Sequence, residues 1–475
     1  MRVGTLFLLL HLLLACSQVG EQTQEISQSN LSTSLDSLGR TIIAEGNILG
    51  FSVTIDSSGT SIYNGNFGYL DTSKTKAIQH DTRFDIASVS KMIGVAVIMK
   101  LVEQGKLNLD QTIEELLPDF PKKEVARKIR LRHLVSHTSG LIDNTLEVDS
   151  VFTATGITPK RNDFYNAFSE KYLLFEPETN YQYNNLGFVL MAFIAEKATN
   201  KSWQELINEM INEPTGLDFQ LIKHVVDSAT TSPIFNYNEG SFEKLTPWVY
   251  VMGDGGLTAN SEMLSKFPRH LVQGDIILKS SLDEMVTPKQ LNDGTTTGYG
   301  YGVRNGFFLE DQIIGHTGGW KSTYAIMAYL PGRDITFAGL MNTDNTPDNI
   351  YKIFTQFMTR YLGKSFPDHT KNSKKFEKPE QLLGDYHGFG DEFDNEGTTV
   401  TITMEGNQLY YCVADTCDPL RYIEDNKFWL AKYPYDYIEF EVNEKASAIR
   451  EYYYGFFQVL RRRYKKQNNH QQTLK

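Results

Sequence analysis

Hydrophobic and polar residues alternate in two widely separated stretches of the chain. Phe51-Ser52-Val53-Thr54-Ile55 alternates one for one, and the polar turn Ser57-Ser58-Gly59-Thr60 leads into a second apolar run from Ile62. Later in the chain, the turn Pro331-Gly332-Arg333-Asp334 separates the runs 323–330 and 335–341. A period of two residues, interrupted by Gly, Pro and Asp, is typical of paired antiparallel strands. The pattern therefore predicts a β-hairpin at each place.

Between these hairpins the apolar spacing changes to that of helices. Over residues 90–106 the apolar side chains recur at threes and fours, and Gly105 is a stop signal. A second apolar helix is predicted from Phe188 to Ala198. Strands at both ends with helices between them predict an α/β fold of the α+β type, in which an antiparallel sheet packs against helices.

Residues 364–380 differ in character from the chain on either side. They contain Lys and Pro and few apolar positions, which is typical of a linker between domains. Residues 381–463 then form short runs rich in aromatic residues, for example 400–404 and 409–413 around a Gly406-Asn407 turn. This pattern predicts a small C-terminal β-barrel or sandwich after a first domain over 38–363, with a polar tail over 464–475.

The N-terminus looks like a targeting segment. Arg2 precedes an apolar run that is too short to span a membrane, and Leu13-Leu14-Ala15-Cys16 ends it. This resembles a bacterial lipoprotein signal over residues 1–16, which predicts lipid attachment at Cys16 and a tether over 17–37. An ordinary cleaved signal peptide is the alternative. Either way, we expect export to the bacterial cell envelope, and the lipid would make the membrane a partner.

The composition narrows the classes of function and partner that we expect for this protein. The 475 residues are 40% hydrophobic and 22% charged, as expected of a globular protein, and the net charge of -12 argues against nucleic acid as a partner. The one basic run, 461–466, is expected to be solvated. Cys412 and Cys417 would lie in an oxidising compartment, either as a local disulfide or as free buried thiols. Neither lies near a histidine pair, so no metal site is expected.

Ser88 and Lys91 are the first candidates for chemistry. They lie three residues apart where the apolar segment before them ends and the helical pattern begins, which places the amine beside the hydroxyl at a helix N-terminus. A serine needs a base to become a nucleophile, and a desolvated lysine can act as one. Ser73 and Lys76 have the same spacing, but they lie in a polar turn with no apolar helix behind it. A capping serine and a surface lysine are the structural alternative for Ser88.

Two further motifs lie far away in the sequence. Tyr183-Asn184-Asn185 precedes the second apolar helix and could present a phenol and an amide to a cleft. Gly315-His316-Thr317-Gly318-Gly319 follows a strand and opens the last hairpin, where small residues allow a substrate backbone to approach. Each motif is uninformative alone.

In this order, Ser-x-x-Lys, Tyr-x-Asn and His-x-Gly resemble the serine β-lactamase and penicillin-binding protein superfamily, in particular its class C-like branch. The segments 81–91, 131–141, 253–257 and 298–302 also look like that family. The resemblance covers about 38–362 and implies a β-lactamase/transpeptidase-like fold with an all-helical subdomain. The C-terminal strands resemble the lipocalin-like barrels appended to such enzymes.

The resemblance also implies roles for single residues. Ser88 would be the acylated nucleophile, Lys91 and Tyr183 would share the acid and base work, and Asn185 would bind the substrate amide. The strand with Gly318 and Gly319 would bind substrate, with the oxyanion held by the N–H groups of Ser88 and Gly319. The segment around His137 is structural in the family. No cofactor is expected.

His316 departs from the Lys-Thr-Gly of penicillin-binding proteins and most β-lactamases. A lysine favours a substrate carboxylate, whereas histidine is largely neutral above pH 7. We therefore expect His316 to contribute to binding a small-molecule or peptide substrate, with a titration near its unperturbed pKa if its charge matters, and we do not expect efficient penicillin hydrolysis. The prediction is a serine hydrolase acting on an ester or amide. A D-amino-acid-specific peptidase acting on cell-wall peptides and a penicillin-binding sensor without turnover are the alternatives, and the oligomeric state cannot be read from the sequence.

Overall fold

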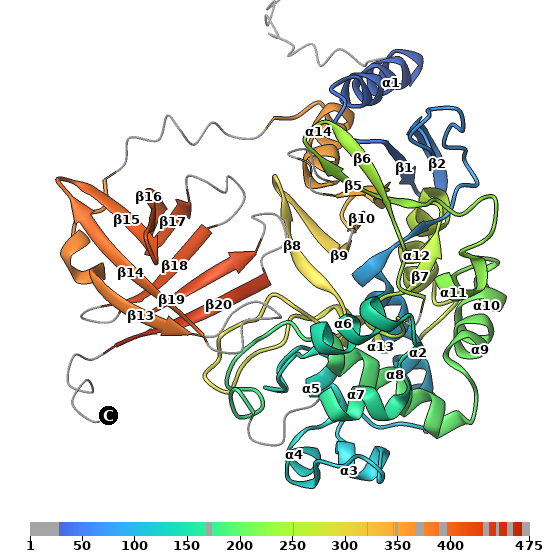
Figure 1. Cartoon of the computed structure of the whole chain (residues 1–475). Helices are drawn as coiled ribbons and strands as arrows, with labels where there is room; N and C mark the ends of the chain where they lie inside the picture. The colour runs from blue at the N-terminus through green and yellow to red at the C-terminus, as the bar shows by residue number, and fades with distance from the viewer. Residues whose placement is uncertain are drawn as a thin grey trace, which may run out of the picture.

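The protein has a large mixed α/β part and a smaller β-barrel (Figure 1). The computed structural model describes residues 28–167, 173–249, 251–320, 322–344, 346, 350–365, 375–388, 397–430, 437–442, 446–453 and 459–467. Cys16, the predicted signal peptide and the first part of the predicted tether lie outside these residues. Within the described ranges, no helix is both long enough and apolar enough to cross a bilayer.

A six-stranded antiparallel sheet forms the centre of the larger part. Its strand order is β2-β1-β11-β10-β9-β8, so strands from both ends of this part lie side by side. The bounds are β1 Gly50–Ser57, β2 Thr60–Gly68, β8 Arg304–Phe308, β9 Asp311–Trp320, β10 Thr323–Leu330 and β11 Ile335–Met341. Both predicted hairpins are present, and β1 pairs with β11 from Phe51 opposite Met341 to Ser57 opposite Ile335. The predicted fold class is confirmed.

Helices cover both faces of this sheet. Helices α1 (Gln28–Ala44) and α14 (Ile350–Leu362) lie on one face, where Phe51 meets Phe357 edge to face, and α12 (Ser261–Gln273) lies on the other. The polar residues of the alternating β1 pattern therefore do not face solvent. The hydroxyls of Ser52 and Thr54 are buried against the Ser261 hydroxyl at 2.7 and 2.8 Å.

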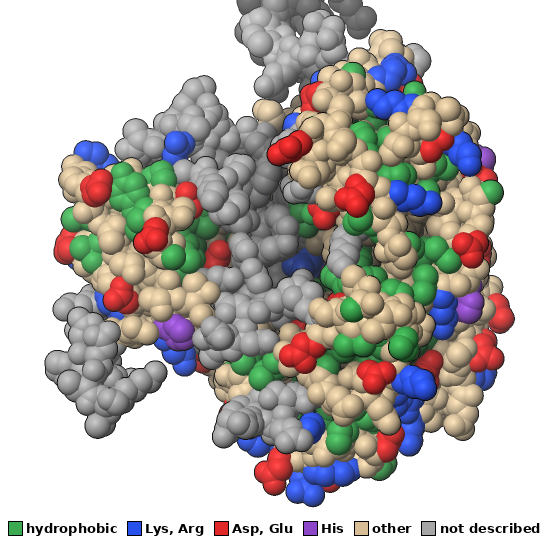
Figure 2. All heavy atoms as spheres, in the orientation of Figure 1, with side chains coloured by type: hydrophobic (Ala, Val, Ile, Leu, Met, Phe, Trp, Pro, Cys, Tyr) green, Lys and Arg blue, Asp and Glu red, His purple; other side chains and the backbone are tan. Residues whose placement is uncertain are grey.

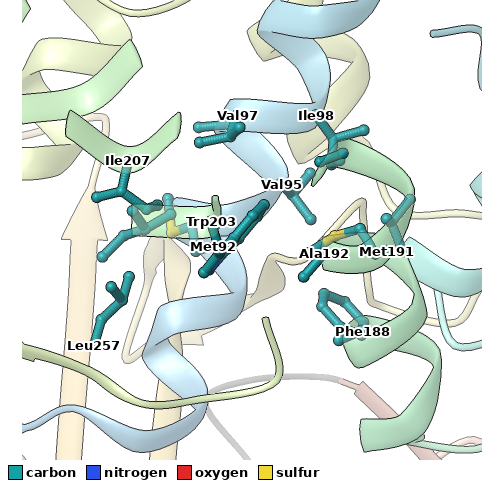
Figure 3. Close-up of a cluster of buried hydrophobic side chains, with 14 of the residues drawn as sticks. Met92, Val95, Val97, Ile98, Phe188, Met191, Ala192, Trp203, Ile207 and Leu257 are labelled. Atoms are coloured by element: carbon teal, nitrogen blue, oxygen red, sulfur yellow. The ribbon is translucent and has the colours of Figure 1, made fainter. Parts of the chain in front are cut away.

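The helical part of the domain is built around α2 (Ser90–Glu103), which is buried along almost its whole length. It ends three residues before the predicted end, because Gly105 turns the chain with a φ of 67°. Figure 3 shows side chains of α2 packing against α8 (Asn185–Thr199) and α9 (Trp203–Ile207): Met92, Val95 and Ile98 meet Phe188, Met191, Ala192 and Trp203. This core holds the start of α2 in place.

The remaining elements of this part are short and mostly connect the sheet to the helices. In chain order they are β3 Phe84–Asp85, η1 Ala87–Val89, α3 Ile113–Leu116, α4 Lys123–Lys128, α5 Leu131–Val135, α6 Thr145–Thr155, α7 Arg161–Ala167, η2 Asn208–Asn212, α10 Glu213–Thr215, β4 Gln220–Leu221, α11 Ile222–Val225, β5 Ile234–Asn238, β6 Ser241–Leu245, β7 Leu257–Ala259, α13 Lys279–Val286 and β12 Thr343–Asp344.

The C-terminal part is a closed antiparallel barrel of eight strands, preceded by the short turn η4 (Pro379–Leu382). The strands are β13 Gly384–Gly388, β14 Thr398–Glu405, β15 Gln408–Val413, β16 Thr416–Glu424, β17 Lys427–Leu430, β18 Tyr437–Val442, β19 Ala446–Tyr453 and β20 Val459–Lys466. Apolar and aromatic side chains fill its interior. Cys412 and Cys417 lie opposite each other on β15 and β16 and form a disulfide.

The barrel packs directly on the larger part. Strand β20 lies beside β8 (Figure 1), and Tyr437 and Tyr452 belong to the same buried cluster as Tyr299 and Leu291. Acidic and basic side chains are intermixed over the described surface on the face shown in Figure 2.

Two predicted boundaries are wrong. Residues 28–37 are not a tether but the first part of α1, because Leu31, Leu35 and Leu38 recur at helical spacing and pack against the sheet. The polar tail does not begin at 464, because β20 continues to Lys466, where Lys465 and Lys466 pair with β13 and close the barrel. The predicted linker and the remaining tail lie partly outside the described residues.

Candidate active site

Ser88 lies in the one-turn helix η1, immediately before α2. The residue before it, Ala87, has a φ of 44°, a left-handed conformation that is uncommon for a residue with a side chain. This conformation is stabilised by the Asp85 carboxylate, which accepts a hydrogen bond from the Ala87 N–H at 2.8 Å, and by the Ile86 N–H, which donates to the Leu257 carbonyl. Ser88 therefore lies at a tight, hydrogen-bonded turn of the backbone. Its position at the start of a helix agrees with the sequence pattern.

Lys91 is completely buried, and its Nζ donates three hydrogen bonds. The acceptors are Ser88 Oγ at 3.0 Å, Asn185 Oδ1 at 2.8 Å and the backbone carbonyl of Asp254 at 2.6 Å. The helical turn that runs from η1 into α2 brings the amine to the hydroxyl, and the other two contacts come from distant segments. The tertiary structure thus aims the amine at Ser88.

Asn185 is the first residue of α8 rather than part of a loop, which the sequence pattern did not predict. Asn184 caps this helix by accepting the Gly187 N–H at 2.6 Å. The buried Asp143 carboxylate accepts the N–H of Asn185 at 2.5 Å. These two contacts orient the Asn185 side chain toward Lys91.

Two basic side chains lie close to the Tyr183 ring. Lys91 Nζ is 4.8 Å from the ring centroid and the Arg304 guanidinium carbon is 5.4 Å from it. Arg304 begins β8, opposite Gly315 of β9, and is buried. No motif marked Arg304 in the sequence. Two basic groups from different elements therefore lie near this phenol.

His137 has a structural environment, in agreement with what the resemblance implied. Its Nδ1 accepts the Asn184 N–H at 3.0 Å, and its ring lies 4.2 Å from that of Tyr183 and 4.8 Å from that of Phe188. Burial, with the charge of Lys91, holds its pKa well below the ordinary value. His137 thus supports the Tyr-x-Asn segment.

His316 does not occupy the position expected of a substrate-binding side chain. It is completely buried, with Nε2 2.9 Å from Tyr299 Oη and Nδ1 2.5 Å from the Thr317 carbonyl. Burial first, and then the charges of Arg304 and Lys91, hold its pKa well below the ordinary value. The expected titration near the unperturbed pKa therefore does not fit this environment. The sequence could not reveal it, because the residues that bury His316 come from other segments.

Gly318 and Gly319 bring strand β9 against the nucleophile segment. A Cβ on Gly318 would lie 2.4 Å from the Ile86 carbonyl oxygen and 3.0 Å from the Ser88 nitrogen, so only glycine fits there. Gly319 pairs with Tyr324 of β10 and lines the pocket next to Ser88. The structure thus brings together the three motifs that are far apart in the chain.

A pocket of about 50 Å³ lies beside Ser88. The described residues that line it are Asp85, Ala87, Ser88, Thr145, Asp149, Phe164, Asn185, Trp248, Val251, Met252, Asp254, Gly255, Gly256, Gly319 and Trp320. Sequence patterns singled out Ser88, Asn185 and Gly319 among these. Asp149, Phe164 and Trp248 lie in segments without a motif. Within the described ranges, no group of three or more His, Cys, Asp or Glu side chains is arranged to hold a metal ion.

Two carboxyl groups of this pocket are perturbed. Burial raises the pKa of Asp85 to about 6, and the Ala87 N–H opposes this rise. Burial also raises the pKa of Asp254 to about 6, against the attraction of Lys91. Perturbed groups beside a nucleophile are typical of functional sites.

Known proteins share this arrangement of elements. Residues 35–356 match the family model described as Beta-lactamase. Penicillin-binding protein 4* of Bacillus subtilis is 26% identical over 376 residues, which are 75% of this chain and 82% of that protein. Two solved structures show the same fold. The octameric penicillin-binding protein homologue from Pyrococcus abyssi has a TM-score of 0.63 at 21% identity, covering 91% of this chain and 99% of that one. The D-amino acid amidase from Ochrobactrum anthropi SV3, complexed with L-phenylalanine amide, has a TM-score of 0.59 at 21% identity and covers 70% and 98%.

Proposed function

Since this chain belongs to the beta-lactamase family and is a serine hydrolase-type enzyme, we propose that it hydrolyses an ester or amide bond through an acyl-enzyme on Ser88. The observation that carries the proposal is the 3.0 Å hydrogen bond between Lys91 Nζ and Ser88 Oγ beside a pocket that Ser88 itself lines. A nucleophile within hydrogen-bond reach of a base is the arrangement that nucleophilic catalysis needs.

Acylation begins when Ser88 Oγ attacks the substrate carbonyl carbon. Its proton passes to Lys91 Nζ in the neutral form or to the Tyr183 phenolate, and the new Oγ–C bond leaves a negative charge on the carbonyl oxygen. The backbone N–H groups of Ser88 and Gly319 bind this oxyanion. The bond to the leaving group then breaks as the leaving group takes up the proton.

Deacylation repeats these steps with water. The same base accepts a proton from water, the hydroxide attacks the acyl carbon, and the Oγ–C bond breaks. Ser88 Oγ recovers its proton and the acid product leaves. When the Tyr183 phenolate is the base, protonated Lys91 and Arg304, both near its ring, stabilise its negative charge.

The test compares Ser88→Ala with Ser73→Ala, because Ser73 has the same spacing to a lysine but lies in an exposed turn. We expect Ser88→Ala to lower turnover of a p-nitrophenyl ester by at least about 10³-fold and to abolish the mass adduct formed with a fluorophosphonate. Ser73→Ala should retain both. Turnover by folded Ser88→Ala, or an adduct on another residue, would overturn the proposal. A stable adduct without turnover in the unmodified protein would indicate a sensor instead.

The cell-envelope location stands as a separate proposal that rests on residues 1–16. The apolar run and Leu13-Leu14-Ala15-Cys16 support lipid attachment at Cys16. In cells fed labelled palmitate, the full-length protein should carry the label and fractionate with membranes. Cys16→Ala should lose both properties, and a labelled Cys16→Ala would contradict the proposal.

A further inference from the structure

The pocket beside Ser88 is acidic. Its three charged lining residues in the described part of the chain are Asp85 on β3, Asp149 on α6 and Asp254 in the loop before β7. None of the described lining residues is Lys, Arg or His. Three independent elements thus place carboxyl groups around the same space beside Ser88.

The described residues do not neutralise the Asp85 and Asp254 carboxyl groups fully. For Asp85, the one favourable interaction among the described residues that opposes the effect of burial is the Ala87 N–H, and no cation of these residues contributes. Asp254 is stabilised by Lys91 and by the backbone N–H groups of Met252 and of Asp254 itself, and the buried Asp143 opposes this stabilisation. Among the described residues, Asp254 Oδ1 is still buried without a hydrogen-bond partner. A buried carboxylate whose charge is only partly balanced is costly, and a cationic ligand would remove part of that cost.

The rest of the pocket wall is aromatic. Phe164 comes from α7, and the rings of Trp248 and Trp320 lie with their centroids 3.6 Å apart. Aromatic faces bind both apolar side chains and cations. The wall therefore suits a group that carries an ammonium and an apolar side chain, and its carboxyl groups disfavour an anionic acyl group.

We infer that this pocket selects an acyl group bearing a protonated amine, such as the aminoacyl group of an amino-acid ester or amide, with Asp85, Asp149 and Asp254 surrounding the ammonium. This inference rests on the proposed acyl-enzyme at Ser88. It assigns substrate specificity to carboxyl groups on β3, α6 and the loop before β7.

The test uses thiobenzyl esters that differ only in the acyl group. Both enantiomers of the phenylalanyl ester carry the amine, the 3-phenylpropanoyl ester lacks it, and the N-succinyl-phenylalanyl ester replaces it with an anion. We expect kcat/KM to follow the order amine, neutral, anion. The α-ammonium also changes intrinsic reactivity, so the decisive quantity is the amine-to-neutral ratio in the unmodified enzyme divided by the same ratio in a variant.

Asp149→Asn and Asp254→Asn should each lower the amine-to-neutral ratio by about 10-fold or more, as expected for losing a charged hydrogen bond. Glu147→Gln is the matched control, because Glu147 lies on α6 with Asp149 but is exposed. It should leave the ratio unchanged. Acylation by the neutral ester, followed by mass, shows that each variant is folded and competent.

An amine-to-neutral ratio that stays constant in both Asn variants, or a preference for the succinyl ester, would overturn the inference while leaving the acyl-enzyme intact. If no ester of the series acylates Ser88 in the unmodified enzyme, the proposed function itself fails. The two failures are therefore distinguishable.

Discussion

Replacing Gly318 with alanine perturbs the contact between strand β9 and the segment that carries Ser88. The new Cβ would lie 2.4 Å from the Ile86 carbonyl oxygen, 3.0 Å from the Ser88 nitrogen and 3.1 Å from the Ala87 Cβ. Two of these three atoms belong to the backbone, so no side chain can rotate away to make room. The nucleophile segment or the strand must shift.

The size of the shift follows from the contact distances. Ordinary contacts of a Cβ begin at 3.4 Å, so relieving the 2.4 Å approach to the Ile86 oxygen requires a displacement of about 1 Å. A misplacement of about 1 Å at a reacting group lowers the rate by about 100-fold, and overpacking costs about 1–3 kcal/mol of unfolding free energy. We therefore expect slower acylation by about two orders of magnitude in a protein that still folds.

The assay is the pre-steady-state burst with a chromogenic ester, together with thermal unfolding to confirm the fold. Gly332→Ala is the control, because Gly332 lies in the β10–β11 turn and a Cβ there would meet nothing within 4 Å. It should acylate at the unmodified rate. A burst rate within about threefold of normal in folded Gly318→Ala would refute the reasoning that this close approach positions Ser88.

Three further predictions concern buried ionisable groups. Lys91→Met should lower kcat/KM by about 10²–10⁴-fold, because it removes the base beside Ser88, and folded enzyme with less than about a tenfold loss would contradict that role. Asp85→Asn should raise the unfolding free energy near pH 7 by about 3 kcal/mol, because the folded-state pKa of about 6 lies above the ordinary 3.8 and the charged form is disfavoured on folding. In denaturant titrations, this gain in unfolding free energy should shrink as the pH falls from 6 through 4, because the Asp85 carboxyl of the unmodified protein then becomes protonated. A gain that does not depend on pH would contradict the prediction. The His316 imidazole should show no protonation midpoint near its ordinary pKa of 6.5 in NMR titrations, because burial lowers its pKa well below that value, and a midpoint near 6.5 would contradict this. Since unfolded His316 does bind a proton, its contribution to stability should fall as the pH drops below about 6.5.

Local sequence patterns predicted much of the fold. The hairpin of β10 and β11, the start of α2 and the strands β14 and β15 all lie where periodicity and turn residues indicated them. These features depend on residues close together in the chain, so they can be read without knowing the tertiary structure. Ser88 and Lys91 belong to the same class, because one helical turn is enough to bring them together.

Features that depend on distant segments could not be read in this way. The alternation in β1 does not show that α12 buries Ser52 and Thr54. Residues 28–37 form a helix because the sheet offers an apolar face for it. An alternating pattern shows which side chains of a strand are polar. It does not show their hydrogen-bond partners, which can come from any part of the chain.

The same distinction applies to the active site. The sequence by itself determined which residue types are available: a serine with a lysine one turn later, a tyrosine, an asparagine and a glycine pair. Only the tertiary structure decided that Arg304 lies by Tyr183, that His316 is buried, and that Asp149 from α6 joins Asp85 at the pocket. Charge and burial at a site are sums over all neighbouring groups, and those neighbours become known only when the chain is folded.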